Sequence, residues 1–214
     1  MSRTWFWSDL HLGHEFVAKS RGFKELEIGG AGIIGSMGIS SAVPHDLEIM
    51  SGWMENVRPK DTIWILGDIS GGRNEEYALN FIKGLPGTKH LIAGNHDSVS
   101  SIHRNGWKKQ ARFLDVFASV QQFARIKVQK QNVLLSHFPY AGAGDHKEEE
   151  RYMEYRLTDV GLPLVHGHVH AAWDKKLTEC AGTPMLNVGV DHWVDRPANV
   201  EDIIEWLRVE DVIQ

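Results

Sequence analysis

The chain has 214 residues, enough to bury a sizeable core, and we expect residues 1–214 to form a single domain. A hydrophobic content of 42% and a charged content of 24% are ordinary for a globular protein, and we expect neither a membrane span nor a leader before Trp5. The net charge of −5 argues against strong nucleic-acid binding, and the one cysteine, Cys180, excludes an internal disulfide framework and fits a reducing cytoplasm. We expect Cys180 to be a small core or strand residue.

The first half of the sequence alternates strand-like and helix-like patterns. Three apolar runs predict buried strands, at residues 3–8, 62–66 and 88–93. Between the first two runs, apolar residues recur at helical spacing after Pro44, a good first-turn residue, and Pro59 ends the pattern. We expect four residues to form the inner face of this helix: Leu47, Met50, Met54 and Val57.

A second helix is predicted between the second and third strands. Asn74, followed by two glutamates, is typical of a helix start, and Gly84 is typical of a helix end. We expect Ala78, Phe81 and Ile82 to form its inner face. The glycine-rich segment 29–41 is explained least, and its apolar residues suit a substrate lid, an oligomer contact or a loop packed on the core.

The second half is richer in strand-like segments. They lie at residues 116–128, 132–135, 162–165 and 184–190, and a last helix begins after Asn199. A βαβαβ start followed by a strand-rich half predicts an α/β (α+β) protein built as a two-sheet β-sandwich flanked by α-helices. In such architectures the chemistry usually lies at the carboxyl ends of the strands.

Five short clusters of polar residues follow these apolar runs. They are Asp9-x-His11, Gly67-Asp68, Gly94-Asn95-His96-Asp97, Ser136-His137 and Gly167-His168-x-His170. Each is common by chance, but together, each at the end of a predicted strand, they indicate one site. Carboxylates, imidazoles and an amide oxygen are ligands that Mn, Fe, Zn or Ni accept. A pair of such ions can hold both the attacking and the leaving oxygen of a phosphoryl transfer.

In this order the clusters resemble the calcineurin-like, binuclear metallophosphoesterase family, whose pattern is D-x-H, G-D, G-N-H-[DE], a lone His and G-H-x-H. The resemblance implies that family's fold and two divalent metal ions. It implies that the first ion is held by Asp9, His11, Asp68 and His170. It implies that the second ion is held by Asp68, Asn95, His137 and His168, with Asp68 bridging.

The charges of these residues agree with that assignment. Two divalent ions about 3.5–4 Å apart repel each other, so a shared carboxylate and a hydroxide are needed between them. Asp9 and Asp68 contribute −2 and the hydroxide −1 against +4, which leaves +1, a charge suited to a phosphodiester monoanion. A bridging hydroxide is available at neutral pH as an in-line nucleophile. We expect manganese, although these ligands also admit Fe, Zn, Ni or Co.

The resemblance also implies roles for residues that do not bind metal. His96 would lie beside the scissile phosphate and assist the leaving group, with Asp97 orienting its ring. His14 could contact a substrate phosphate or simply begin a helix, and Arg73 could also reach a phosphate. We expect His166 to support a ligand or to pack in the core. The remaining expectations are that Asn187 and Asp191 support the centre, and that Trp173, Trp193 and Trp206 are core residues.

Departures from the family pattern narrow the substrate. Ser/Thr protein phosphatases carry G-D-x-V-D-R-G and G-N-H-E, whereas here Arg73 comes one step later and Asp97 replaces the glutamate. The chain instead resembles short bacterial and phage phosphodiesterases, for which small diesters such as cyclic nucleotides, including 2′,3′-cyclic ones, are the expected substrates. The alternatives are a phosphomonoesterase or nuclease of the same family and a non-catalytic, metal-bound scaffold.

Overall fold

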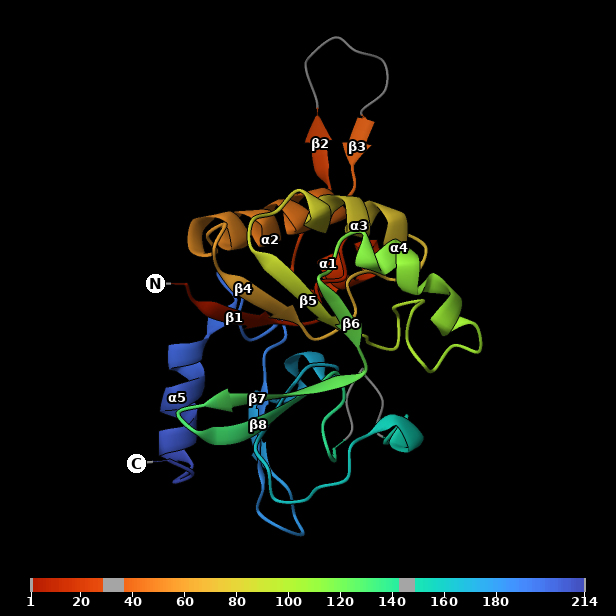
Figure 1. The fold of residues 1–214 in the computed structure, drawn as a ribbon. Helices are drawn as coiled ribbons and strands as arrows, with labels where there is room; N and C mark the ends of the chain where they lie inside the picture. The colour runs from red at the N-terminus through yellow and green to blue at the C-terminus, as the bar shows by residue number, and fades with distance from the viewer. Residues whose placement is uncertain (1, 29–36, 143–148, 214) are drawn as a thin grey trace.

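The computed structural model of this chain describes residues 2–28, 37–142 and 149–213. Two five-stranded sheets lie face to face, with helices over the outer side of the first sheet and one helix beside the second (Figure 1). The predicted fold class, two sheets flanked by helices, is therefore confirmed. No helix within the described ranges is long and apolar enough to cross a membrane.

The first sheet has the strand order β12-β1-β4-β5-β6. Its members are β1 (Thr4–Trp7), β4 (Thr62–Ile65), β5 (Thr88–Ile92), β6 (Ser119–Gln121) and β12 (Ala198–Asn199). Strands β1, β4, β5 and β6 are parallel, and β12 pairs antiparallel with β1. The parallel strands therefore end at one edge of the sheet, as the alternation of strands and helices predicts.

The second sheet has the order β10-β11-β9-β8-β7. Its members are β7 (Phe123–Val128), β8 (Gln131–Ser136), β9 (Leu164–His166), β10 (Lys175–Leu177) and β11 (Pro184–Asn187). Its three central strands are parallel, whereas β7 and β10 pair antiparallel at the two edges. The strand expected at 116–128 is thus two strands in different sheets, and the one expected at 162–165 is displaced by two residues at its start.

The helices are α1 (Glu15–Ser20), α2 (Ala42–Asn56), α3 (Glu75–Lys83), α4 (Gln110–Leu114) and α5 (Val200–Val209), with short 3-10 turns at Gly106–Lys109, Met153–Tyr155 and His170–Ala172. Asn199 begins α5 with a capping box, since its side chain accepts from the backbone of Asp202 and the Asp202 carboxylate accepts in return. Trp206 of α5 is buried between the helix and the sheets, and Trp173 and Trp193 pack against core clusters. These three tryptophans therefore belong to the core, as expected.

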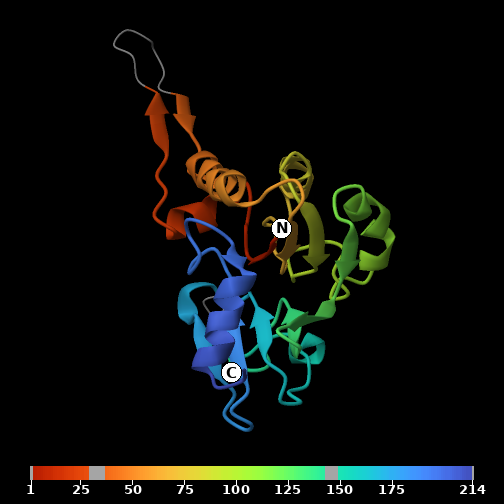
Figure 2. The same cartoon turned by 60° about the vertical axis from the view of Figure 1, so that its left-hand side comes forward.

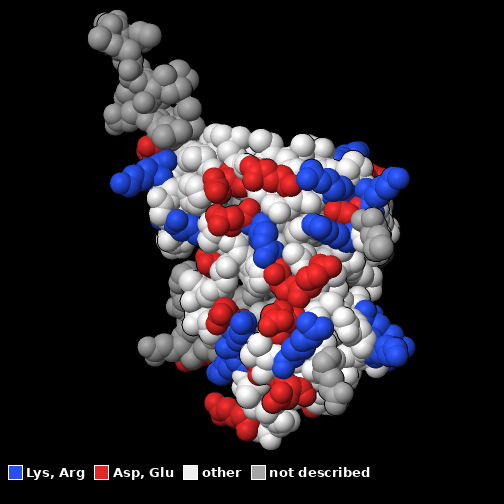
Figure 3. Space-filling view, turned by 90° about the vertical axis from the view of Figure 1, so that its left-hand side faces the viewer, with Lys and Arg blue, Asp and Glu red and all other residues white. Residues whose placement is uncertain are grey.

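Strands β2 (Leu26–Ile28) and β3 (Met37–Ile39) form a two-stranded ribbon that extends away from the rest of the molecule (Figures 1 and 2). Residues 29–36 of the glycine-rich segment lie outside the described residues, so the interpretations of that segment stay predictions. On the face shown in Figure 3, acidic and basic side chains are mixed, and no broad area of one sign is visible.

The predicted inner face of α2 is wrong for three of its four residues, since only Val57, which follows the helix, is buried. Leu47, Met50 and Met54 are exposed, whereas Ile49 and Trp53 are buried under the helix. The sequence of α2 contains two stripes at helical spacing, and the buried one is broken by His45 and Asp46, whose side chains are also buried. Periodicity alone therefore favoured the wrong stripe, because polar residues with specific partners interrupt the stripe that packs.

Cys180 is also placed differently from our expectation. It is exposed in the turn between β10 and β11, not in the core or in a strand. Thr178 and Thr183 close this turn, because the backbone N–H of Thr178 donates to the Thr183 carbonyl at 2.9 Å. A lone cysteine has no periodic pattern around it that would have placed it there.

The reassigned face of α2 can be tested with two truncations in one helix. We expect Ile49→Ala to lower the free energy of unfolding by about 2–5 kcal/mol, because it leaves a cavity against the first sheet. Leu47→Ala, the control on the exposed stripe, should change it by less than about 0.5 kcal/mol. Urea denaturation followed by circular dichroism measures both. Equal losses would restore the face expected from periodicity.

Candidate metal centre

The polar clusters lie where parallel strands end. Asp9 follows β1, Asp68 follows β4 and Asn95 follows β5, so the first sheet brings three clusters to one edge. In the second sheet, β8 is followed by His137, and β9 is followed by His168 and His170. The two sheets meet at this edge, because Ser8, after β1, bridges to Gly189, after β11, and the backbone N–H of His168 donates to Asp9 Oδ2 at 3.0 Å.

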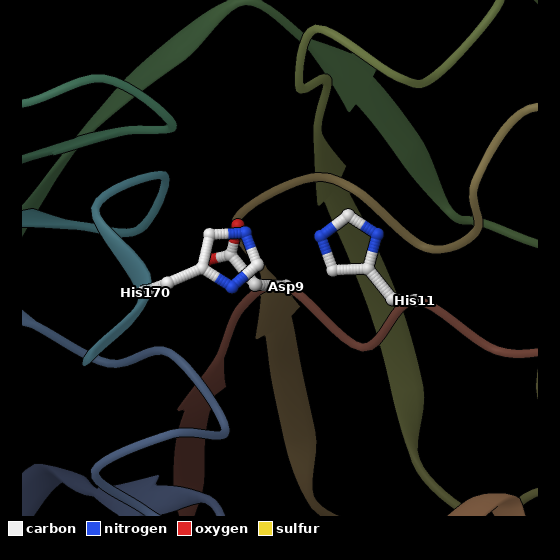
Figure 4. A group of neighbouring side chains, drawn as sticks. All are labelled: Asp9, His11 and His170. Carbon is white, nitrogen blue, oxygen red and sulfur yellow. The ribbon is translucent and has the colours of Figure 1, made fainter. Parts of the chain in front are cut away.

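One group of donors consists of Asp9, His11 and His170. Their donor atoms lie within 4.8 Å of one another, and all three residues are buried. Figure 4 shows the three side chains side by side. Asp9 Oδ1 and both ring nitrogens of His11 are buried without any hydrogen-bond partner. Each such atom costs about 1–3 kcal/mol when left unsatisfied, and a cation would satisfy Asp9 Oδ1 and the one nitrogen of His11 that carries a lone pair. The group therefore fits the predicted first ion.

A second group consists of Asp9, Asp68 and His137. His137 Nδ1 lies 2.7 Å from the Leu66 carbonyl, which can only accept, so Nδ1 carries the hydrogen and Nε2 presents a lone pair. That lone pair faces Asn95 Oδ1 at 3.0 Å and Asp68 Oδ2 at 3.5 Å. These three atoms are all hydrogen-bond acceptors, so they cannot satisfy one another. A cation bound between them would satisfy all three, which fits the site predicted for the second ion.

The two groups adjoin each other. Asp9 belongs to both, and Asp68 Oδ2 lies 3.9 Å from His11 Nε2 as well as 3.5 Å from His137 Nε2. His168 lies beside the second group, with its ring 5.2 Å from that of His137, and Asn95 also contacts His137. Five of the predicted ligands thus belong to the two groups and the other two adjoin the second, and Asp9 is the carboxylate that the groups share.

The electrostatics of the protein alone also fit cations. Burial raises the pKa of Asp68 well above its ordinary value, and the charges of Asp97 and Asp9 raise it further. Burial lowers the pKa of His11 well below its ordinary value, with His170 adding to the effect, and burial likewise lowers the pKa of His168. A divalent cation would reverse the effect on the carboxylate and would bind the neutral imidazoles directly.

Five of the predicted ligands adopt left-handed backbone conformations. Their φ angles are 57° for Asp9, 46° for His11, 54° for Asp68, 71° for His168 and 46° for His170. Non-glycine residues rarely adopt such angles, and each costs about 1–3 kcal/mol, so they persist only where surrounding contacts impose them. The strand direction is thereby broken at each ligand, which is why the three histidines of residues 166–170 do not share one face.

The glycines of the motifs are required by close packing at the ligands. A Cβ on Gly94 would overlap Asp68 Oδ1, and a Cβ on Gly167 would overlap the Asp9 carboxylate. Gly67, at φ +94°, would place a Cβ 2.5 Å from His137 Nδ1. Each glycine therefore keeps open the space that a ligand from another strand occupies.

The role expected for Asp97 needs correction. Its carboxylate accepts three backbone N–H groups, from Gly94 at 2.8 Å and from Asp68 and Ile69 at 3.0 Å each. Both oxygens are therefore directed at the loops that carry Asp68 and Asn95, and not at the ring of His96. Asp97 positions ligands, and the G-N-H-D sequence could not distinguish this from orienting the histidine because both roles place a carboxylate after His96.

His96 projects toward the centre without joining either donor group. It is half-buried, and its ring packs edge-on against that of His11 with 5.5 Å between centroids. Its backbone N–H donates to Asp68 Oδ1 at 2.8 Å, which fixes the start of the side chain relative to a ligand. Its position beside the ligands is the one that a residue contacting substrate requires.

The two predicted phosphate-binding residues lie differently. His14 begins α1, and its Nδ1 accepts from the Val17 backbone at 3.3 Å, the helix-start alternative. Its ring is still 5.7 Å from that of His11, at the border of the centre. Arg73 is exposed in the loop between β4 and α3, so phosphate binding by its side chain stays a prediction.

His166, Asn187 and Asp191 surround the His170 turn. His166 donates to the Gly167 carbonyl and packs on Trp173, outside both donor groups. Asn187 donates to the carbonyl of His170 at 2.8 Å, and Asp191 Oδ2 lies 3.3 Å from His170 Nδ1. Burial is the largest single effect and lowers the pKa of His170, but the bond to Asp191 and the charges of Asp9 and Asp191 together leave the pKa raised.

Sequence reasoning missed Arg21. Its guanidinium contacts Asp191 and the Asp9 carbonyl from the end of α1. Arg21 lies in no motif. Nothing in the sequence connects it with Asp9, which is 12 positions earlier, or with Asp191, which is 170 positions later.

Comparisons with known proteins agree with this geometry. A family model described as calcineurin-like phosphoesterase matches residues 2–172. A Gene 66 protein of Mycobacterium phage D29 is 37% identical over 202 residues, covering 91% of each chain. That of Mycobacterium phage L5 is also 37% identical over 202 residues, covering 90% of this chain and 88% of the relative. A solved structure of a protein of unknown function from Aquifex aeolicus shares the fold, with a TM-score of 0.63 at 22% identity, covering 96% of this chain and 100% of that one.

The packing of Gly94 predicts a loss of metal without a loss of fold. In Gly94→Ala the new methyl group would displace the Asp68 carboxylate, and we expect metal affinity to fall by about 10-fold or more. Gly84→Ala is the control, because its Cβ would meet nothing closer than the Phe81 carbonyl at 3.6 Å. Bound metal is counted after dialysis by atomic emission. Equal metal content in both variants would contradict the packing argument.

Proposed function

The chain belongs to the calcineurin-like phosphoesterase family, and we propose that it is a metal-dependent phosphodiesterase hydrolysing small phosphodiesters, including 2′,3′-cyclic nucleotides. The observation that carries this proposal is the pair of adjoining, buried donor groups that share Asp9 and lie beside the half-buried His96. Two divalent cations held there, manganese in our proposal, would supply a nucleophilic water of lowered pKa and would offset the charge of the phosphate.

The residues of the chain favour a diester over a monoester. Asp9 and Asp68 are the two carboxylates of the donor groups, and the remaining predicted ligands are neutral imidazoles and an amide. With few negative charges on the protein side, the site retains positive charge for an anionic substrate. A diester monoanion matches a small residual charge better than a monoester dianion does.

His96 would act on the leaving oxygen. Burial lowers the pKa of His96 to about 4, and the neighbouring His137 and His14 add to this effect, so the ring is neutral at neutral pH. A neutral imidazole still carries one N–H, which can donate a hydrogen bond to the departing oxygen and stabilise its developing charge. The hydrogen bond from the His96 backbone to Asp68 fixes the position of the His96 side chain relative to the ligands.

Features of the loops support a small diester over a phosphoprotein. The second cluster continues Ile69-Ser70-Gly71-Gly72 before Arg73, without the acid found in Ser/Thr phosphatases, and Asp97 stands where those enzymes have glutamate. The side chain of Arg73 is exposed. A phosphomonoesterase or nuclease of the same family and a metal-bound scaffold are the alternatives that an assay must exclude.

The proposal predicts a metal requirement and a diester preference. After chelation, single metals are restored and turnover is measured on bis-p-nitrophenyl phosphate, p-nitrophenyl phosphate, and 2′,3′- and 3′,5′-cyclic AMP. We expect Mn²⁺ to restore activity and the diesters to be the better substrates. Preference for p-nitrophenyl phosphate would assign a phosphomonoesterase, and no turnover with any metal would favour a binding scaffold.

The role of His96 predicts a dependence on the leaving group. We expect His96→Ala to keep both metals but to lower turnover by about 10²–10⁴-fold on 2′,3′-cyclic AMP, whose leaving group is a ribose hydroxyl. The loss should be much smaller on bis-p-nitrophenyl phosphate, because nitrophenolate leaves without assistance. His90→Ala is the control, since His90 stacks on Trp64 in the first sheet. Equal losses on the two substrates would refute assistance to the leaving group.

A further inference from the structure

The side chain of Arg21 is buried and contacts both the segment that carries the ligand Asp9 and the carboxylate of Asp191, which in turn contacts the ligand His170. Arg21 follows the last residue of α1, and its side chain is 7% exposed. Nε and Nη2 donate to the two carboxylate oxygens of Asp191 at 3.1 and 2.8 Å, a bidentate pair. Nη2 also donates to the backbone carbonyl of Asp9 at 2.8 Å. One guanidinium thus joins α1 to the ends of two distant chain segments.

The contact with Asp9 acts on the backbone of a ligand. Asp9 and His11 have φ angles of 57° and 46°, so the chain turns sharply between these two ligands as it leaves β1. Left-handed backbone at these positions is unfavourable and needs contacts that impose it. The hydrogen bond from Arg21 to the Asp9 carbonyl is such a contact, and it fixes the direction in which the Asp9 side chain projects.

The contact with Asp191 acts on a second ligand. Asp191 Oδ2 lies 3.3 Å from His170 Nδ1, so the carboxylate accepts the hydrogen on Nδ1 and leaves Nε2 as the nitrogen to face an ion. Because Arg21 holds both oxygens of Asp191, the carboxylate cannot rotate away from His170. The same guanidinium therefore orients Asp9 directly and His170 through Asp191.

Arg21 is itself held by α2. Its Nη1 lies 2.9 Å from His45 Nε2, and because a guanidinium has only donors, that nitrogen accepts. His45 Nδ1 then donates to Asp46 at 2.8 Å, and Asp46 also accepts from the Gly13 backbone at 2.9 Å and from Tyr77 at 2.9 Å. This network accounts for the two polar residues on the buried face of α2.

We propose that Arg21 is a positioning residue for the first ion, the one assigned to Asp9, His11 and His170. It contacts neither ion nor substrate, and it acts by fixing two of the ligands from one rigid, multiply bonded side chain. This inference rests on the proposed metal-dependent function. It adds a requirement that the family motifs do not contain. The first position depends on α1 and on Asp191 through both Asp9 and His170, whereas the second position shares only Asp9 with it and depends on Arg21 less.

The test compares the two metal positions in conservative variants. In Arg21→Lys the charge remains but one ammonium cannot hold Asp191 bidentately and the Asp9 carbonyl together. In Asp191→Asn the volume remains but the acceptor pair is lost. Each chelated protein is titrated with Mn²⁺, and free Mn²⁺ is followed by its electron paramagnetic resonance signal. Circular dichroism and thermal unfolding in chelator verify that each variant folds.

We expect the unaltered protein to bind two ions, and each variant to bind one of them about 10–100-fold more weakly. The other ion, whose donor group shares only Asp9 with the first, should weaken much less. Arg196→Lys is the matched control, because Arg196 makes a similar bidentate pair with Asp202 at 2.6 and 3.0 Å next to α5. It should lose stability without losing either ion.

Three results would overturn the inference. If Arg21→Lys and Asp191→Asn bind both ions as tightly as the unaltered protein, Arg21 positions nothing. If both ions weaken equally, its role is general support of the fold. If the unaltered protein binds no pair of ions, the proposed function itself fails, and the inference fails with it.

Discussion

Three backbone N–H groups converge on the carboxylate of Asp97, and the rest of the centre depends on that contact. Two of them belong to the loop after β4 and one to the loop after β5. The carboxylate therefore holds adjacent strand ends at a fixed separation, so that Asp68 and Asn95 reach the same space. A buried carboxylate that accepts several N–H groups is rigid, because each oxygen already has its partners.

Around that contact the protein keeps arrangements that are unfavourable without cations. Asp9 Oδ1 and the ring nitrogens of His11 are buried without partners, and His137 Nε2 faces two oxygens. Left-handed backbone at the ligands adds a conformational cost. Costs of this kind are concentrated at functional sites, where the surrounding structure imposes them, and here motif glycines and Arg21 provide that support. The folded chain thus stabilises a geometry that metal binding would satisfy.

The predictions from sequence agree with the structure better at the metal centre than in the helices. Five of the seven predicted ligands lie in the two donor groups, and the sequence indicated them because their residue types are unusual at strand ends and their order is specific. The inner face of α2 was predicted wrongly, because His45 and Asp46 interrupt the stripe that packs and their partners Arg21 and Gly13 are remote in sequence. Short elements such as α1, α4 and β10 were missed, because three to six residues carry too little periodicity to be recognised.

The sequence by itself determined the fold class and indicated the strand ends and the candidate donors, because strand periodicity and donor chemistry are local properties of the chain. Only the tertiary structure decided that Asp97 holds loops and does not orient His96, that Asp9 is shared between the donor groups, and that Arg21 joins Asp9 to Asp191. These decisions depend on which segments approach one another across the two sheets. Their hydrogen-bond geometry follows from packing between residues far apart in the chain, for which the sequence carries no spacing signal.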